Sequence, residues 1–429
     1  MNISAAAKLN PQLLLNEDQK RIVLASIYEI EGALVSYLKD QEVSSNSDVY
    51  LANGTTGIAL FFAYLQAAGL GTTAATARDC LAPGVEAVAA RPMSASLYGG
   101  FPGIAWTLQH VTALLGEASD DIGDNIDVAL EPYLTRSPWN DDYDLISGLV
   151  GLGVYCLERA NFPVAQRCLE LIVERLSELA EASGRGLRWH TRPALLTLQQ
   201  RENYPEGHYN LGLAHGLPGI IALLGRMYAA GISREKTRRL LEGAVEWLLQ
   251  HRLPQDNQSS FSAVYVPGQQ AETCRLAWCY GDAGVAAALL LAARSVEEKS
   301  WEQEALTIAR RAAARDGQTC GVRDACFCHG SSGLAHIFNR LYQATHDEVF
   351  SGASRYWIAR TLEFCKAGDG PAGFRVLATD GNGEITRQAK YGILIGIAGI
   401  GLSLLAATSA VEPCWDRILL LDIPPLPPS

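Results

Sequence analysis

The chain has 429 residues, of which 48% are hydrophobic and 19% charged; this balance suits a folded protein rich in buried helix and excludes an intrinsically disordered one. Its formal net charge of −11 argues against a nucleic-acid partner, which would need a concentrated surface of Lys and Arg. No run of about twenty apolar residues and no secretion signal occur, so we expect a cytoplasmic protein that is not an integral membrane protein and keeps its ten cysteines reduced.

Seven amphipathic segments recur along the chain. In each of them apolar residues return at helical spacing with charged residues between, which is typical of a helix with one buried face. These segments cover residues 17–39, 73–90, 121–135, 163–183, 233–251, 301–315 and 350–366. We interpret them as outer helices.

A second kind of segment follows each outer helix and begins with Gly-x-x-Gly. The run after the motif is apolar on nearly every side, so it predicts a helix that is buried nearly all round. The seven motifs start at Gly54, Gly100, Gly148, Gly216, Gly281, Gly330 and Gly396. A closed ring with these helices inside and the amphipathic ones outside buries both kinds. We therefore predict a single all-α domain over residues 1–429, an α/α toroid with seven inner and seven outer helices; an open helical solenoid is the alternative.

The motif glycines should gather at one rim of the toroid. We expect glycine there because it permits positive φ and a close approach of backbones. The spacing between motifs is uneven, with extra length before Gly216, Gly281 and Gly396. Residues 261–267 alternate in polarity, and residues 374–390 contain the hairpin signal Asp-Gly-Asn-Gly at 380–383. These segments predict small β-containing loop insertions at the rim.

Reactive side chains stand just before several motif glycines. If the glycines gather at one rim, these side chains converge in space although they are far apart in sequence. Asp144 lies four residues before Gly148. Cys279 and Cys328 lie two residues before Gly281 and Gly330. His215, Tyr280 and His329 directly precede Gly216, Gly281 and Gly330.

Cys279, Cys328 and His329 form a plausible set of three zinc ligands. Thiolate and imidazole are favoured by zinc, and a catalytic site leaves the fourth position open. Cys326 is an alternative to Cys328, because it lies only two residues earlier. The competing interpretation is a group of buried thiols beside a hydrogen-bonded core histidine.

His215 holds the same position before its glycine as His329. It is a candidate for an acid or base paired with Asp144, for a fourth zinc ligand, or for a core histidine. Asp144 by itself could equally cap a helix N-terminus. Arg275 and Tyr280 flank Cys279 and, taken alone, would be assigned to rim packing or surface charge.

Most of the other cysteines fall within apolar helical patterns. We expect Cys80, Cys156, Cys168 and Cys365 to be small core residues rather than reactive thiols. No catalytic role is assigned to them.

The motifs Ala214-His215-Gly216, Arg275-Leu-Ala-Trp-Cys279-Tyr280-Gly281 and Cys328-His329-Gly330, set among seven Gly-x-x-Gly repeats, resemble those of the lanthionine cyclase (LanC) family. The resemblance extends over nearly the whole chain. It implies an α/α toroid and places the family's zinc ligands on Cys279, Cys328 and His329. The family's active-site residues then fall on the four positions His215, Asp144, Arg275 and Tyr280.

The resemblance implies a zinc-dependent enzyme that forms lanthionine or methyllanthionine rings. A substrate cysteine thiol bound to zinc loses its proton and adds to dehydroalanine or dehydrobutyrine. His215 and Asp144 are expected to assist proton transfer to the α-carbon, and Arg275 to stabilise the enolate oxygen.

The family also implies partners. They are a dehydrated precursor peptide with a leader segment, a dehydratase and a membrane transporter, in a complex that would bring a cytoplasmic enzyme to the membrane periphery. The chain is expected to be a cyclase without a fused dehydratase domain. Two other functions stay open, a LanC-like enzyme that adds glutathione to dehydroamino acids and a non-catalytic peptide-binding toroid.

Overall fold

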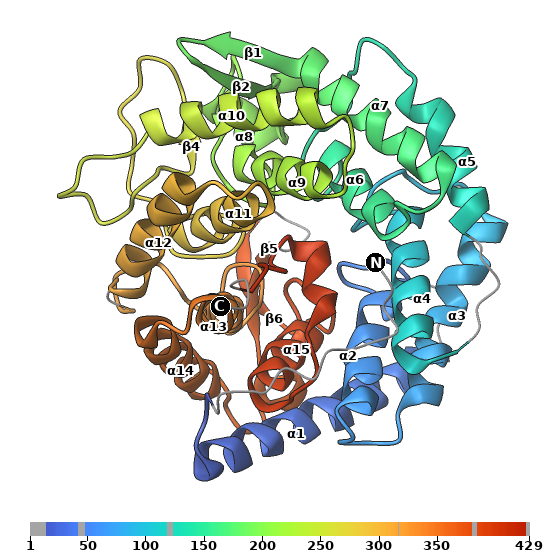
Figure 1. Cartoon of the computed structure of the whole chain (residues 1–429). Coiled ribbons are helices and arrows are strands. Elements are labelled where there is room, and N and C mark those ends of the chain that lie inside the picture. Colours follow the sequence, from blue (N-terminus) through green and yellow to red (C-terminus); the bar gives the residue numbers. More distant parts are fainter. Residues whose placement is uncertain (1–13, 42–47, 118–122, 316, 380–383, 426–429) are drawn as a thin grey trace. The chain divides into compact units, whose positions relative to one another are not determined.

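The computed structural model describes residues 14–41, 48–117, 123–315, 317–379 and 384–425. These residues group into two compact units, whose elements are labelled in Figure 1. Of the described residues, unit 1 contains those up to 94, those in 98–117 and those in 322–415, and unit 2 contains those in 95–97, 123–321 and 416–425. That residues 1–429 form a single domain stays a prediction.

Each Gly-x-x-Gly motif begins a helix, as predicted. In unit 1 these helices are α2 (Thr55–Ala67), α4 (Phe101–Leu115), α13 (Ser331–Thr345) and α15 (Ile397–Thr408), and in unit 2 they are α6 (Leu149–Glu158), α9 (Leu217–Ala229) and α11 (Asp282–Ser295). Every residue of α11 from Asp282 to Ala293 is buried. Burial on all sides is what an uninterrupted apolar run predicts.

The amphipathic segments form the outer helices. In unit 1 they are α1 (Glu17–Gln41), α3 (Ala74–Ala90) and α14 (Glu348–Glu363), and in unit 2 they are α5 (Gly123–Leu134), α7 (Pro163–Leu179), α10 (Arg234–Gln250) and α12 (Lys299–Ala313). In α12 the buried residues Ala305, Ile308, Ala309 and Ala312 form one stripe, and the other residues are exposed or partly exposed. Among the helices described, none combines the length and apolarity that crossing a membrane requires.

Five of the outer helices pack on the inner helices that directly precede them in the chain. Helix α3 packs on α2, α7 on α6, α10 on α9, α12 on α11 and α14 on α13. The first outer helix, α1, packs on the last inner helix, α15, and both belong to unit 1. The packing pair is therefore an inner helix followed by an outer one, although the order read along the sequence begins with an outer helix.

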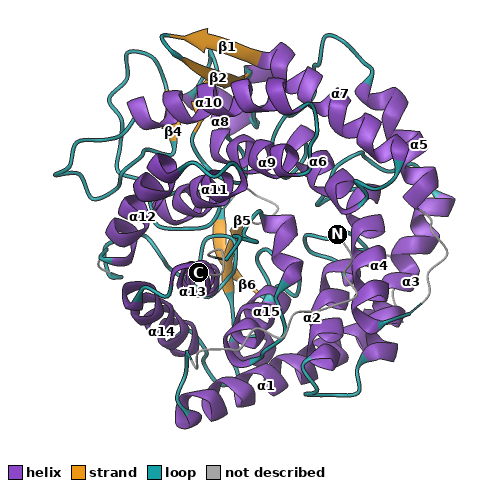
Figure 2. Cartoon of the chain, viewed as in Figure 1, coloured by secondary structure: helices purple, strands orange, loops and turns teal. Residues whose placement is uncertain are grey.

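Short strands interrupt the helices where the spacing between motifs is long (Figure 2). Unit 2 has an antiparallel sheet in the order β1 (Ala180–Ser183), β2 (Gly186–Thr191), β3 (His208–Asn210) and β4 (Val264–Tyr265), and unit 1 has the hairpin β5 (Val376–Thr379) with β6 (Ile385–Gln388). The predicted β-containing insertions at 261–267 and 374–390 are thus present, while the turn at 380–383 lies outside the described residues. The remaining short helices are α8 (Leu198–Asn203), η1 (Pro193–Leu195), η2 (Pro371–Gly373) and η3 (Cys414–Leu419).

The second glycine of a motif lies so close to a neighbouring backbone that there is no room for a side chain. A Cβ on the second glycine of a motif would collide with the carbonyl oxygen six residues earlier, at 1.9 Å for Gly333 and Phe327 and at 2.2 Å for Gly284 and Trp278. Such distances are far below van der Waals contact, so a side chain there would push the preceding turn away. The first glycine of each motif caps the inner helix. The expectation of positive φ holds for Gly281, with φ 110°, and was wrong for the first glycine of the other motifs, whose backbone is extended.

Three of the four cysteines expected in the core are buried. These are Cys80, Cys156 and Cys168, whereas Cys365 is exposed and the prediction for it was wrong. Helix α14 ends at Glu363, so Cys365 lies beyond its buried stripe, in the turn where its Sγ donates to the carbonyl of Ala372 at 3.4 Å.

Candidate functional site

Backbone hydrogen bonds join the turns that precede the inner helices of unit 2. The amide of Leu145 donates to the carbonyl of Ala214 at 3.1 Å, and the amide of Ala214 donates to the carbonyl of Cys279 at 3.3 Å. The turns before α6, α9 and α11 are therefore fixed edge to edge. The side chains that these turns carry are brought together, as the repeat predicted.

The same connection links the turns of unit 1. The amide of Cys328 donates to the carbonyl of Leu394 at 2.8 Å, that of Leu394 to Ala52 at 3.4 Å and that of Ala52 to Tyr98 at 3.0 Å. All four residues stand two positions before a motif glycine. Cys279 in unit 2 occupies the equivalent position, so both cysteines predicted to bind zinc hold the same place in their repeats.

His215 and Asp144 form a hydrogen-bonded pair in unit 2. Nδ1 of His215 lies 2.6 Å from Oδ2 of Asp144, while Oδ1 of Asp144 accepts the backbone N–H of Ser147 at 2.7 Å. Burial lowers the pKa of His215, but the hydrogen bond and charge of Asp144, with Cys279 and Asp142, outweigh burial and raise it. Asp144 thus caps its own turn with one oxygen and holds the histidine with the other.

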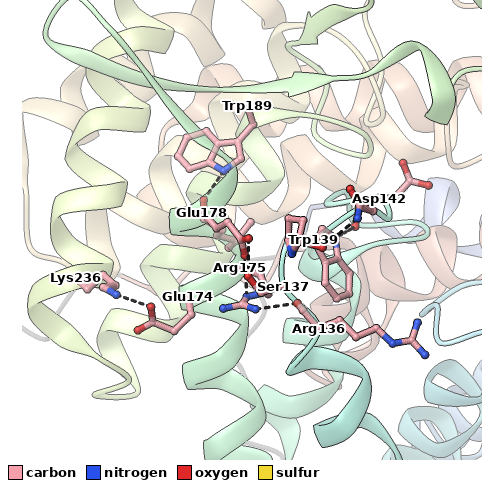
Figure 3. Close-up of polar contacts among 12 residues, drawn as sticks. Arg136, Ser137, Trp139, Asp142, Glu174, Arg175, Glu178, Trp189 and Lys236 are labelled. Carbon is pink, nitrogen blue, oxygen red and sulfur yellow. Dashed lines mark hydrogen bonds and ion pairs between the residues drawn. The ribbon is translucent and has the colours of Figure 1, made fainter.

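The loop that carries Asp144 is anchored to helix α7 (Figure 3). Nη1 of Arg175 on α7 donates to the carbonyl of Arg136 at 2.8 Å, and Nε1 of Trp139 donates to the carbonyl of Asp142 at 3.0 Å. Burial, and then the charge of Asp144, raise the pKa of Asp142 to about 6. A carboxyl group with a raised pKa therefore lies beside the pair formed by His215 and Asp144.

Arg275 and Tyr280 lie on either side of Cys279 in unit 2. Nη2 of Arg275 donates to Sγ of Cys279 at 3.4 Å, and a guanidinium in this position stabilises a thiolate. The ring of Tyr280 stacks near that of His215, with 6.0 Å between ring centroids. Its hydroxyl accepts a hydrogen bond from Nδ2 of Asn210 at 2.9 Å, and burial raises the pKa of Tyr280 to about 12.

Unit 1 carries Cys328 and His329, with Asp324 and Cys326 close to His329. Nε2 of His329 lies 3.8 Å from Oδ2 of Asp324, and one ligand atom each from Asp324, Cys326 and His329 fall within 4.8 Å of one another. Asp324 already accepts backbone N–H bonds at both oxygens, from Cys326 at 2.9 Å and from Leu377 at 2.7 Å. Both oxygens are thus engaged by the backbone, so Asp324 suits a charged neighbour of the His329 imidazole better than a metal ligand.

Comparison with known proteins identifies the family. The sequence profile of the family described as "Lanthionine synthetase C-like protein" matches residues 45–420. The chain belongs to this family.

Two known proteins are similar to this chain. The chain is 26% identical over 268 residues to the nisin biosynthesis protein NisC of Lactococcus lactis subsp. lactis, a match that covers 58% of this chain and 63% of that protein. The matched segment is thus less than two thirds of that relative's length. The solved structure of nisin cyclase superposes with a TM-score of 0.71 at 21% identity and covers 91% of this chain and 96% of its own. This likeness confirms the predicted fold class, an all-α α/α toroid with small β-containing insertions.

Three polar residues of this family member were not singled out in the sequence, although they share a position. Asp48, Asn210 and Asp324 each stand six residues before a motif glycine. Oδ1 of each accepts the backbone N–H two residues ahead, at 2.9 Å in all three, which makes an Asx turn. The repeat spacing was therefore a signal that could have found them.

Proposed function

We propose that this member of the lanthionine synthetase C-like family is a zinc-dependent lanthipeptide cyclase. It would add cysteine thiols of a dehydrated peptide to dehydroalanine or dehydrobutyrine and so form lanthionine or methyllanthionine rings. The pairing of His215 with Asp144 beside Cys279, in a chain matched by the family profile over residues 45–420, supports this proposal most directly. A histidine held in this way suits proton transfer at neutral pH.

Cys279, Cys328 and His329 would hold the zinc ion. Two thiols and an imidazole match the donor types that zinc prefers, and three protein ligands leave one position for a substrate thiol. Cys326 is completely buried, whereas Cys328 is partly exposed, which favours Cys328 as the ligand. The charge of Asp324, 3.8 Å from Nε2 of His329, would favour the ring orientation in which this nitrogen faces the carboxylate.

Zinc, when bound, would lower the pKa of the substrate thiol so that its sulfur reacts as a thiolate. In the addition the thiol loses its proton, a carbon–sulfur bond forms at the β-carbon, the carbon–carbon double bond is lost and the α-carbon gains a proton. The balance requires no oxidant, and the mass of the peptide does not change. The residues of the chain must therefore move one proton and stabilise charge that develops on the carbonyl oxygen.

His215 is proposed as the group that moves this proton. With Nδ1 directed at Asp144, Nε2 is the nitrogen that can exchange a proton with the substrate. The raised pKa of His215 increases the fraction that carries a proton at neutral pH. Arg275 and Tyr280 are the nearby donors proposed to stabilise the developing oxyanion.

The proposed partners follow from the proposed reaction. The enzyme would work in the cytoplasm on a dehydrated precursor peptide with a leader segment, beside a dehydratase and a membrane transporter that would bring it to the membrane periphery. These partners stay proposals.

The test uses the purified full-length chain, a dehydrated lanthipeptide precursor and glutathione. Cyclisation consumes free thiols, counted by alkylation, at constant peptide mass, whereas glutathione addition raises the mass by one glutathione per event. We expect thiol loss at constant mass, with zinc bound to the wild type and activity lost in Cys279→Ala. Glutathione addition without ring closure, or full ring formation by Cys279→Ala, would contradict the proposal.

A further inference from the structure

We propose that Asn210 is a positioning residue that turns the hydroxyl of Tyr280 into a hydrogen-bond donor for the substrate. This inference rests on the proposed function, because it assigns the Tyr280 hydroxyl to the oxygen on which negative charge develops during addition. Asn210 is only 5% exposed and lies at the end of β3, in the sheet of unit 2.

The orientation of the Asn210 amide is fixed from both ends. Its Oδ1 accepts the backbone N–H of Gly212 at 2.9 Å, so Nδ2 must face the other way. There Nδ2 lies 2.9 Å from the Tyr280 hydroxyl oxygen and 3.5 Å from Nε2 of His208. A flipped amide would place Nδ2 against the N–H of Gly212 and lose that bond. The direction of the bond to Tyr280 is therefore set: Asn210 donates and Tyr280 accepts.

This direction determines what the Tyr280 hydroxyl can do. A phenol has one hydrogen, and a hydroxyl that accepts from Asn210 keeps its own hydrogen for another acceptor. Tyr280 stacks near His215 and follows Cys279 directly, so the hydroxyl belongs to the group of side chains proposed to meet the substrate. A neutral donor prepared in advance stabilises an oxyanion without reorganisation during the reaction.

Two other repeats show that an amide is not needed for the turn. Asp48 and Asp324 stand at the equivalent position and make the same Asx turn through Oδ1. In Asp324 the second oxygen accepts a backbone N–H, where Asn210 presents an N–H donor. Asn210 thus differs from Asp48 and Asp324 in its second side-chain atom, the nitrogen Nδ2 that faces Tyr280.

The experiment compares Asn210→Asp, Tyr280→Phe and the double variant. Asn210→Asp keeps the acceptor for Gly212 but offers a carboxylate to Tyr280, which must then donate its hydrogen inward. Ring formation on the dehydrated precursor gives kcat and KM for each. Asn203→Asp is the matched control, because Asn203 is an exposed residue at the end of α8.

We expect Asn210→Asp and Tyr280→Phe each to lower kcat about 100-fold, with KM within about twofold of wild type. The double variant should show no further loss of kcat. Asn203→Asp should behave as wild type. Wild-type kcat in Asn210→Asp, or multiplying losses in the double variant, would overturn the inference.

A spectroscopic measurement separates this inference from the proposed function. The ¹³Cζ resonance of Tyr280 in tyrosine-labelled protein, assigned by its absence in Tyr280→Phe, should shift in Asn210→Asp as the hydroxyl changes from acceptor to donor. An unshifted resonance would refute the positioning role even in an active cyclase. If the resonance shifts in Asn210→Asp but the wild type has no cyclase activity, the positioning role stands and the proposed function is refuted.

Discussion

Replacing Asp144 with asparagine tests the role of the hydrogen-bonded pair of His215 and Asp144, because the two side chains have nearly the same shape. The amide of the Asp144→Asn variant can still accept the N–H of Ser147 through Oδ1, so the turn should persist, but its other end then presents an N–H to Nδ1 of His215. The neutral ring would have to accept at Nδ1 and carry its proton on Nε2. The pKa of His215 should fall relative to wild type, because the hydrogen bond and charge that oppose burial are lost.

The size of the effect follows from the geometry of the pair. A hydrogen bond between charged groups contributes about 1.5–3 kcal/mol. Because 42% of the His215 side chain and 11% of the Asp144 side chain are exposed, the lower half of that range applies, about 1.5–2.2 kcal/mol. At about 1.4 kcal/mol per factor of ten, Asp144→Asn should lower kcat about 10- to 40-fold.

The assay is ring formation against pH, followed by loss of free thiols. If protonated His215 is the acid, activity is present below its pKa and is lost as pH rises through it. In Asp144→Asn this alkaline loss should therefore begin at lower pH. Asp141→Asn, on the same turn and bonded to Tyr133, is the control for charge alone. An Asp144→Asn enzyme with unchanged kcat and an unmoved alkaline limb would refute the role assigned to the pair.

Four further predictions concern metal binding and stability. Cys328→Ala should lower zinc affinity at least about 100-fold, measured by competition with a chromogenic chelator. Gly333→Ala should destabilise unit 1 by more than about 2 kcal/mol in urea unfolding, because its Cβ would lie 1.9 Å from a backbone carbonyl oxygen. Gly352→Ala, inside α14 with nothing within 4 Å of the added Cβ, should stabilise by about 0.5–1 kcal/mol in the same assay. Asp127→Ala should cost about 3 kcal/mol of unfolding free energy, since it strips the fully buried Arg159 of its buried partner at 2.8 Å. Equal zinc affinity of Cys328→Ala and wild type would contradict the first prediction. Unfolding curves of the other variants that coincide with that of wild type would contradict the rest.

The helices could be predicted because their signals are local. An apolar run after Gly-x-x-Gly and an amphipathic stripe such as that of α12 are both visible within one segment. Which outer helix covers which inner helix could not be read in the same way. The packing of α1 on α15 joins segments far apart in the sequence, and no periodicity reports it.

Strands and supporting residues were harder to predict because partners decide them. The outer helix expected to reach residue 183 ends at Leu179, since residues 180–183 pair with β2 instead. The residue type of Asn210 does not mark it as special, because its importance lies in hydrogen bonds to Gly212 and to Tyr280, which is distant in sequence. The residues next to the motif glycines were easier to find, because the repeat itself marks their place.

The pairing of α1 with α15 has a consequence for how the protein is made. Almost all of unit 2 comes from the continuous stretch 123–321, so its helices leave the ribosome in succession and meet their neighbours at once. Unit 1 is assembled from segments on both sides of that stretch, and the apolar stripe of α1 lacks its main partner until the last inner helix has been translated. The nascent chain therefore carries α1 without its main partner while residues 42–396 are synthesised, and this half of the protein can complete its folding only after α15 has left the ribosome.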